Sequence, residues 1–209
     1  MDIQTKLTSF AMMGATWVMW LLVCLSIAGL AVALERALYL LRTGDNFRSL
    51  KKDVLGLLSA GDLAGARARL RRSRAVEARV VDAGLADPDD GSASAEERMG
   101  GAAQLAKLRM EKRLAFLGTL GSNAPFIGLL GTVIGIIRAF HELNDSAGKV
   151  TAGLMSQVGE ALVATAIGIL VALPSVAAFN TFQRLIKVRL ARAEALGRNV
   201  LAAFRPEGT

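Results

Sequence analysis

The sequence predicts an all-α membrane protein with three transmembrane helices and long cytoplasmic helical extensions. Apolar runs at 7–34, 114–137 and 150–183 are each long enough to cross a bilayer, which needs roughly 20 residues. The first two runs contain no charged residue, and the third contains only Glu160. Helices are expected because backbone exposed to lipid must satisfy its own hydrogen bonds. A soluble bundle would carry charges at helical spacing in these runs, and a secretory signal would have a shorter apolar core.

The distribution of basic residues predicts the orientation of the chain. Most Lys and Arg residues lie at 36–113 and after residue 183, whereas the N-terminal segment and the 138–149 turn contain few. Under the positive-inside rule, the N-terminus is periplasmic and the C-terminus cytoplasmic. We expect four segments: 1–41, with the first transmembrane helix; 42–113, a cytoplasmic helical loop; 114–183, the second and third transmembrane helices forming a pore hairpin; and 184–209, a cytoplasmic tail.

Composition argues against several other classes of protein. The net charge of +7 does not indicate nucleic-acid binding, because carboxylates in the large loop offset most of its positive charge. Cys24 and His141 are the only residues of their kinds, so we expect neither an internal disulfide nor a zinc site. No Gly-rich phosphate loop or Ser/His/Asp set is present. We therefore expect no metal, no cofactor and no enzymatic activity.

Helical patterns continue through the flanking segments. Residues 1–10 suit a short helix at the outer surface, and the first transmembrane helix is expected to run on through Leu41. In the large loop, apolar residues at helical spacing predict helices at 47–58, 63–70 and 75–86. Ser94 and Glu97 fit a capping box that starts another helix. That helix is expected to continue without a break into the second transmembrane helix.

The second and third runs each contain a central threonine. With the turn centred near residue 148, Thr132 and Thr165 lie at nearly equal distances from it, so two antiparallel helices place them at similar depth. In an oligomer they would form a band of hydroxyl groups able to orient water or pass on a proton. The alternative is that each hydroxyl only bonds to its own helix backbone.

Small residues, prolines and one acid accompany the two threonines. Small residues allow helices to approach closely, either within the hairpin or between copies, and the prolines are candidate kinks. Glu160 is the only carboxylate in the apolar runs, and a role in an ion path or partner contact is favoured over a merely interfacial one. The packing and kink candidates are Pro125, Gly128, Gly131, Gly135, Ala164, Gly168, Ala172 and Pro174.

The segments 121–135 and 159–168 resemble the MotA/TolQ/ExbB proton-channel family, most closely its ExbB branch. The first reads Gly-Ser-Asn-Ala-Pro-Phe-Ile-Gly-Leu-Leu-Gly-Thr-Val-Ile-Gly, and the second Gly-Glu-Ala-Leu-Val-Ala-Thr-Ala-Ile-Gly. By motif position, Thr132 and Thr165 match the family's pore threonines, and Glu160 matches its third-helix glutamate. The resemblance implies a pentamer in the bacterial inner membrane.

The resemblance also implies partners and a function. An ExbD-like single-span subunit would supply the proton-carrying aspartate, and the complex would use the proton-motive force to energise a TonB-like protein for outer-membrane transport. A TolQ-like subunit of the Tol–Pal system stays open, because the segment before the first run is shorter than in some ExbB proteins. A related motility stator, sodium in place of protons, and a structural scaffold without conduction are further alternatives.

Overall fold

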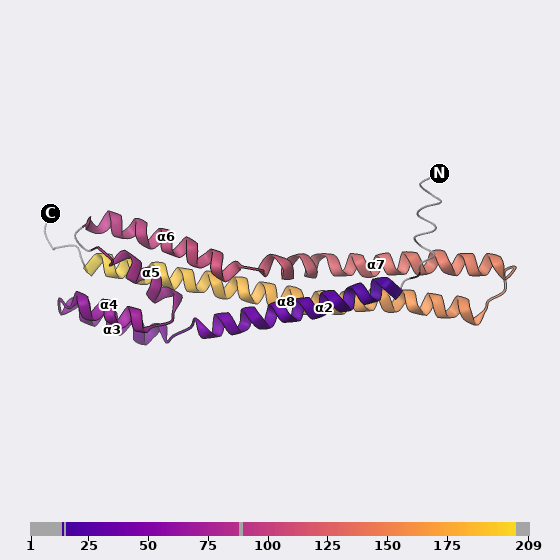
Figure 1. The fold of residues 1–209 in the computed structure, drawn as a ribbon, viewed down its shortest axis with the longest axis horizontal. Helices are drawn as coiled ribbons and strands as arrows, with labels where there is room; N and C mark the ends of the chain where they lie inside the picture. Colours follow the sequence, from indigo (N-terminus) through magenta and orange to yellow (C-terminus); the bar gives the residue numbers. More distant parts are fainter. Residues whose placement is uncertain (1–13, 15, 88–89, 204–209) are drawn as a thin grey trace. The chain divides into compact units, whose positions relative to one another are not determined.

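The computed structural model describes residues 14, 16–87 and 90–203, which form helices and no strand. The segment expected at the outer surface, 1–10, lies outside these residues. Figure 1 shows the helices in chain order. They are α2 (Thr16–Arg42), α3 (Phe47–Ser59), α4 (Leu63–Arg72), α5 (Val76–Gly84), α6 (Gly91–Glu111), α7 (Leu114–Asp145) and α8 (Ala152–Ala203).

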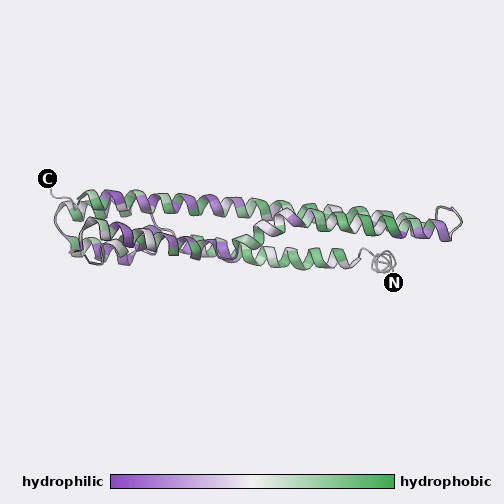
Figure 2. Cartoon of the chain, turned by 90° about the horizontal axis from the view of Figure 1, so that it is seen from above, coloured by the Kyte–Doolittle hydropathy of each residue, from purple (hydrophilic) through white to green (hydrophobic). Residues whose placement is uncertain are grey.

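The chain forms two compact units, each built from two separate stretches of sequence. Among the described residues, the apolar unit comprises 14, 16–34 and 113–180, and the polar unit comprises 35–87, 90–112 and 181–203. The hydropathy colours of Figure 2 separate the two along α2 and α8, which contribute to both. Three helices (α2, α7 and α8) contain windows apolar and long enough to cross a membrane. The predicted all-α class with three candidate spans is confirmed.

The apolar unit is a three-helix arrangement in which α2 packs on both arms of the α7–α8 hairpin. Val18 and Leu22 of α2 are fully buried, and they belong to one core cluster with Leu120 of α7 and Val171 of α8. A Cβ atom added to Gly29 would lie 2.6 Å from the side chain of Leu120, so the two helices are in close contact there. The opposite faces of the three helices are covered with exposed large apolar side chains.

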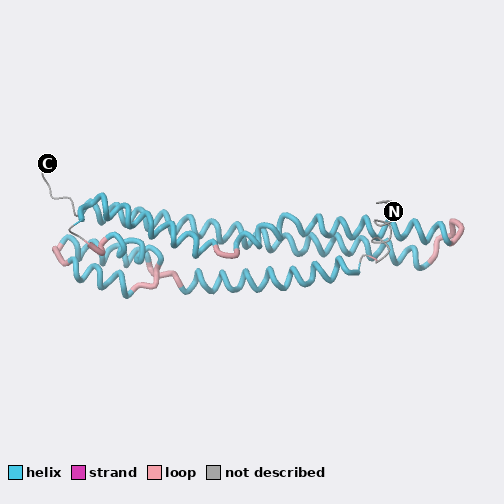
Figure 3. Tube along the Cα trace, turned by 45° about the horizontal axis from the view of Figure 1, so that its top comes forward, coloured by secondary structure: helices cyan, strands magenta, loops and turns pink. Residues whose placement is uncertain are grey.

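The polar unit consists of shorter helices joined by the short loops seen in Figure 3. Asn46 and Asp62 cap α3 and α4, since each side chain accepts a hydrogen bond from a backbone N–H three residues later. Arg189 of α8 reaches the end of α2, where its guanidinium donates to the carbonyl oxygen of Leu40 at 2.6 Å and to that of Thr43 at 3.2 Å. The Leu40 carbonyl also accepts from the Thr43 hydroxyl at 3.3 Å, so Arg189 and Thr43 together satisfy the end of α2.

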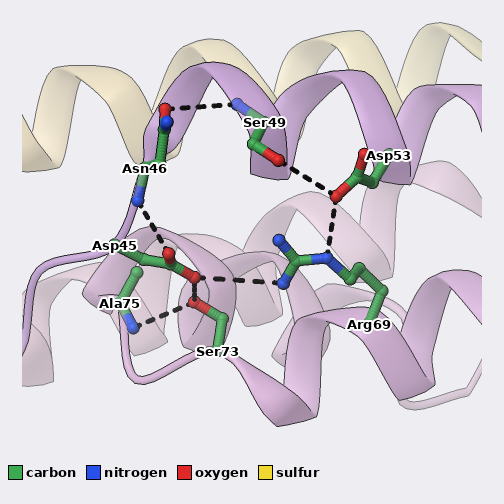
Figure 4. A network of polar contacts seen from close by, with 7 residues as sticks. All are labelled: Asp45, Asn46, Ser49, Asp53, Arg69, Ser73 and Ala75. Carbon is green, nitrogen blue, oxygen red and sulfur yellow. Dashed lines mark hydrogen bonds and ion pairs between the residues drawn. The ribbon is translucent and has the colours of Figure 1, made fainter.

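Figure 4 shows a polar network that joins α3, α4 and the loop before α5. The Asp45 carboxylate accepts from the Ser73 hydroxyl at 2.6 Å and from the backbone N–H of Asn46 at 2.7 Å. Arg69 pairs with Asp53 at 2.9 Å and lies 3.9 Å from Asp45. The Ser73 hydrogen bond, the Asn46 hydrogen bond and the Arg69 charge hold the pKa of Asp45 below its usual range.

One other carboxylate in the polar unit has its pKa shifted in the opposite direction, above its usual range. Glu77 of α5 is 4% exposed. This burial raises its pKa, although a backbone hydrogen bond and the charges of Arg189 and Arg192 partly oppose the shift.

Two local predictions for the segment before α7 are wrong. Helix α6 begins at Gly91, so Ser94 lies inside it and the expected capping box does not form. The predicted continuous helix into the second span is also interrupted, because α6 ends at Glu111 and α7 starts at Leu114. Arg113 adopts φ 64°, a left-handed conformation that a continuing right-handed helix does not permit.

Candidate functional site in the α7–α8 hairpin

The two arms of the hairpin approach so closely that their contact depends on small residues. A Cβ atom added to Gly128 would lie 2.8 Å from the carbonyl oxygen of Ala164 and 3.2 Å from the Cα atom of Gly168. A Cβ atom added to Gly131 would lie 2.6 Å from the Cβ atom of Ala164, and one added to Gly135 would lie 2.5 Å from that of Ala161. The small residues singled out from the sequence therefore line the packing surface within one hairpin, and Ala172 is buried in the adjoining core.

This packing fixes the relative height of the two threonines. Gly131 lies against Ala164. Thr132 directly follows Gly131 in the chain, and Thr165 directly follows Ala164. Because the helices are antiparallel, that step moves Thr132 and Thr165 in opposite directions, and their offset is about 3 Å at 1.5 Å of rise per residue. The two side chains lie within one helical turn of each other along the hairpin.

Both threonines occupy the side of the hairpin that faces away from α2. Gly131 contacts both Ala164 and Val18 of α2, so α2 covers one side of the α7–α8 contact. One residue along a helix turns the side chain by about 100°. Thr132 and Thr165 therefore lie on the same side of the α7–α8 contact, which α2 leaves open; this side, defined by the two threonines, is called the groove below, and both residues are half-buried.

Both threonine hydroxyl groups donate hydrogen bonds to backbone carbonyl oxygens of the protein. Thr165 Oγ1 donates to the carbonyl oxygen of Gly128 across the hairpin at 3.0 Å, and Thr132 Oγ1 donates to Leu129 of its own helix at 2.7 Å. A hydroxyl that donates keeps its oxygen lone pairs as acceptors. The groove therefore presents two acceptor oxygens at similar height on a surface that is otherwise largely apolar.

Glu160 lies on a different side of α8 from Thr165. Its carboxylate accepts a hydrogen bond from the hydroxyl of Thr16, at the start of α2, at 2.7 Å. Five residues separate Glu160 from Thr165, which turns them about 140° apart on the helix. The structure thus brings Thr132 and Thr165 together and directs Glu160 toward the first span.

A second carboxylate, which sequence reasoning missed, ties together the two ends of the hairpin. Glu142 of α7 accepts hydrogen bonds from the Thr151 hydroxyl at 3.0 Å and from the Gln157 amide at 3.1 Å. Thr151 also accepts from the backbone N–H of Leu154, which caps α8. Local spacing gives no signal for Glu142, since its partners come from the other arm.

The two prolines lie inside helices that continue through them, Pro125 in α7 and Pro174 in α8. A proline has no N–H, so the carbonyls of Gly121 and Leu170 lack the donor that a regular helix would supply four residues later. Among the described residues, no group of three or more His, Cys, Asp or Glu side chains is arranged to hold a metal ion.

With this geometry established, comparison with known proteins identifies the family. The model of the MotA/TolQ/ExbB proton channel family matches residues 72–195, which include both arms of the hairpin. The chain belongs to this family. Its members are membrane proton channels and not enzymes, and three apolar helices with a hydroxyl-bearing groove are consistent with that class.

Individual relatives match over part of their length. An ExbB-like protein of Helicobacter pylori is 45% identical over 78 residues, covering 37% of this chain and 52% of the relative. Biopolymer transport protein ExbB of Aquifex aeolicus is 40% identical over 94 residues, covering 45% of this chain and 63% of the relative. Tol-Pal system protein TolQ of Pseudomonas aeruginosa is 37% identical over 114 residues, covering 54% of this chain and 45% of the relative. The chain spans about half the length of the curated relatives it matches.

Proposed function

We propose that this chain is the proton-channel subunit of an inner-membrane motor that uses the proton-motive force to energise TonB-dependent outer-membrane transport. The observation that carries the proposal is that Thr132 and Thr165 lie at similar height in the same groove of the hairpin. Hydroxyl groups make weak, reversible contacts with water and ions, and such contacts suit conduction because an ion must both enter and leave. The family and its ExbB relatives support the same assignment.

The groove needs an enclosing assembly and an acid to transport protons. Apolar side chains cover the outer faces of the unit, so hydroxyl groups become wet only in the interior of an oligomer. We propose a pentameric ring, as the family resemblance implies. Glu160, the only carboxylate of the three apolar runs, accepts from Thr16, so we propose that an ExbD-like single-span subunit supplies the titrating aspartate.

We place the N-terminus in the periplasm and the C-terminus in the cytoplasm. The concentration of Lys and Arg in residues 36–113 and after residue 183 supports this orientation. Glu160 then lies nearer the periplasmic turn than Thr165 by about 7.5 Å of helix rise. At this outer end of the path, its carboxylate can exchange the Thr16 hydrogen bond for water.

Replacement of both hydroxyl groups tests conduction. Valine has nearly the shape of threonine, so Thr132→Val combined with Thr165→Val removes two acceptors with little change in packing. In proteoliposomes that contain the chain and its single-span partner, we expect proton flux to fall at least tenfold (about 1.4 kcal/mol in barrier height). The assembly should keep its mass. An unchanged flux would contradict the proposal and favour a structural scaffold.

A TolQ-like role in the Tol–Pal system is the second candidate, supported by 37% identity to a TolQ protein over 114 residues. Deletion of the gene separates the two roles. Loss of receptor-mediated uptake with an intact envelope supports the TonB-linked function, whereas a leaky envelope with normal uptake supports the Tol-linked one. Replacing the proton gradient by a sodium gradient in the same vesicles identifies the ion.

A further inference from the structure

Ser122 of α7 carries a hydroxyl group ten residues before Thr132. The side chain is exposed, and its hydroxyl donates to the carbonyl oxygen of Gly118 at 3.0 Å or to that of Thr119 at 3.1 Å. The hydroxyl oxygen also accepts a hydrogen bond from the Asn123 amide at 3.3 Å. Because a hydroxyl oxygen has two acceptor positions, one of them stays open for water.

Ser122 lies on the side of the α7–α8 contact that α2 leaves open. Near this level of α7, Leu120 contacts Gly29 of α2, and Gly118 contacts α8. Two residues separate Ser122 from Leu120, which turns its side chain about 200° away from α2. Four residues separate it from Gly118, which turns it only about 40° from a contact with α8. Thr132 likewise lies beside the α8 contact and away from α2, so Ser122 extends the groove.

Pro125 leaves a backbone acceptor beside this hydroxyl. Proline has no N–H, so the carbonyl oxygen of buried Gly121 lacks the donor of a regular helix. Seven residues on, the matching carbonyl of Gly128 accepts from Thr165 across the hairpin at 3.0 Å. Seven residues from Thr165 along α8 stands Ala172, which has no hydroxyl to donate. Buried carbonyl groups are almost always paired with protein or water, so water is the expected donor to Gly121.

The hydroxyl and the carbonyl lie between the two threonines and the end of the apolar unit. Ser122 is about 15 Å of helix rise from Thr132 and about 13.5 Å from Arg113. Residues 124–131 of α7 and 166–174 of α8 are all apolar or glycine. A proton that leaves the threonines toward the cytoplasm therefore meets Ser122 and the Gly121 carbonyl as its next polar groups.

We propose that Ser122 and the carbonyl oxygen of Gly121 bind water and form a second hydrated site of the proton path, on the cytoplasmic side of Thr132 and Thr165. Each oxygen accepts a hydrogen bond from water, so the lone pairs of that water face the groove and accept the incoming proton. The proton then passes to the next water molecule, and no bond of the protein changes. The inference rests on the proposed channel function and adds a residue to its path.

Removal of the hydroxyl tests this site in proteoliposomes that contain the full chain and its single-span partner. Ser122→Ala loses one hydrogen bond of the modest strength found in membranes, so proton flux should fall about 3- to 10-fold. Ser122→Thr keeps a hydroxyl and should restore most of the flux. Ser175 is the matched control, because its hydroxyl donates to Val171 of its own helix at 2.8 Å but is buried toward Gly29 of α2. Ser175→Ala should leave the flux unchanged.

Returning the missing donor tests the carbonyl. Pro125→Ala supplies the N–H that Gly121 lacks, so the carbonyl no longer needs water and flux should fall about threefold. Pro174→Ala is the control, because Pro174 lies nine residues from Thr165, about 180° around α8 and outside the groove. Equal losses for the two substitutions would mean that helix bending, and not the carbonyl, limits the flux.

Thiol labelling tests whether water reaches Ser122. In a Cys24→Ala background, we expect a small charged reagent to modify Ser122→Cys in the assembled complex and to leave Ser175→Cys unmodified. Modification of Ser122→Cys only by a probe dissolved in the lipid would overturn the inference.

The flux measurements also separate this inference from the proposed function. A loss of flux for Thr132→Val with Thr165→Val, but none for Ser122→Ala, overturns the second site and leaves the channel function intact. Unchanged flux in both cases contradicts both proposals. If Ser122→Thr is as slow as Ser122→Ala, or if Ser122→Ala lowers the mass of the assembly, Ser122 has a packing role and the inference is wrong.

Discussion

The apolar and polar units are stabilised by different interactions. In the apolar unit, glycine and alanine bring helix backbones together, and two of its polar bonds, Thr165 to Gly128 and Thr16 to Glu160, join different helices. In the polar unit, helix caps, Arg189 and the Asp45 network hold short helices in place. The first unit should therefore be sensitive to side-chain volume and the second to charge and hydrogen bonding.

The largest expected effect comes from added volume where the two arms of the hairpin meet backbone to backbone. Gly128→Leu forces a side chain against the backbone of Ala164, and overpacking of this kind costs about 3 kcal/mol. Reversible unfolding in detergent measures the loss. Gly100 of α6 is the matched control, because a Cβ atom there meets nothing within 4 Å. Gly100→Ala should leave stability unchanged or raise it, and equal losses at both sites would contradict the comparison.

Removal of the guanidinium at the end of α2 is next in size. Arg189→Met deletes three hydrogen bonds from a charged donor to Leu40 and Thr43, with an expected loss of about 2 kcal/mol. Hydrogen exchange of the last turn of α2 should accelerate accordingly. Exposed Arg184 provides the control, and a similar acceleration for Arg184→Met would show that charge alone, without the bonds, accounts for the effect.

The pH dependence of the stability of the polar unit should distinguish its two carboxylates with shifted pKa values, Asp45 and Glu77. The pKa of Asp45 is lowered on folding, so its stabilisation is present above the unfolded-state pKa and is lost as pH falls through the folded-state value. Asp45→Asn should cost about 1 kcal/mol at pH 7, after allowance for solvent screening, and almost nothing at pH 2. Thermal melts at both pH values measure the difference.

Glu77 serves as an internal control, because its pKa shift is opposite in sign to that of Asp45. Burial raises its pKa, so its contribution is present at low pH and is lost as pH rises through the folded-state value. Glu77→Gln should therefore lessen the loss of stability between acidic and neutral pH. The same pH profile for Asp45→Asn and Glu77→Gln would contradict the assignment of these two shifts.

The smallest effect is expected at the link between the first and third spans. Thr16→Val removes the hydrogen bond to Glu160, worth about 0.6 kcal/mol in a membrane protein. Hydrogen exchange at the start of α2 should increase, with no change at Thr165. A Thr16→Ser variant should behave like the unmodified chain, and a Ser variant as unstable as Val would rule out the hydrogen bond as the cause.

The sequence predicted the elements whose signals are periodic and local. The three apolar runs, the small residues of the hairpin and the end of the first helix near residue 41 follow from composition and spacing. Arg113 was missed because neither it nor its neighbours are glycine or proline, the residues that usually announce a left-handed backbone. The partners of Glu160 and Glu142 come from distant segments, so no local pattern identifies them.

The central claim is that the groove of Thr132 and Thr165 is wet inside the assembled protein. Aqueous thiol labelling of Thr132→Cys and Thr165→Cys in a Cys24→Ala background tests it directly, with apolar Leu130 and Leu170 as matched cysteine sites on the opposite faces. We expect a small charged reagent to modify both threonine positions and neither leucine position. Unmodified threonine positions, together with labelling there by a probe dissolved in the lipid, would contradict the claim.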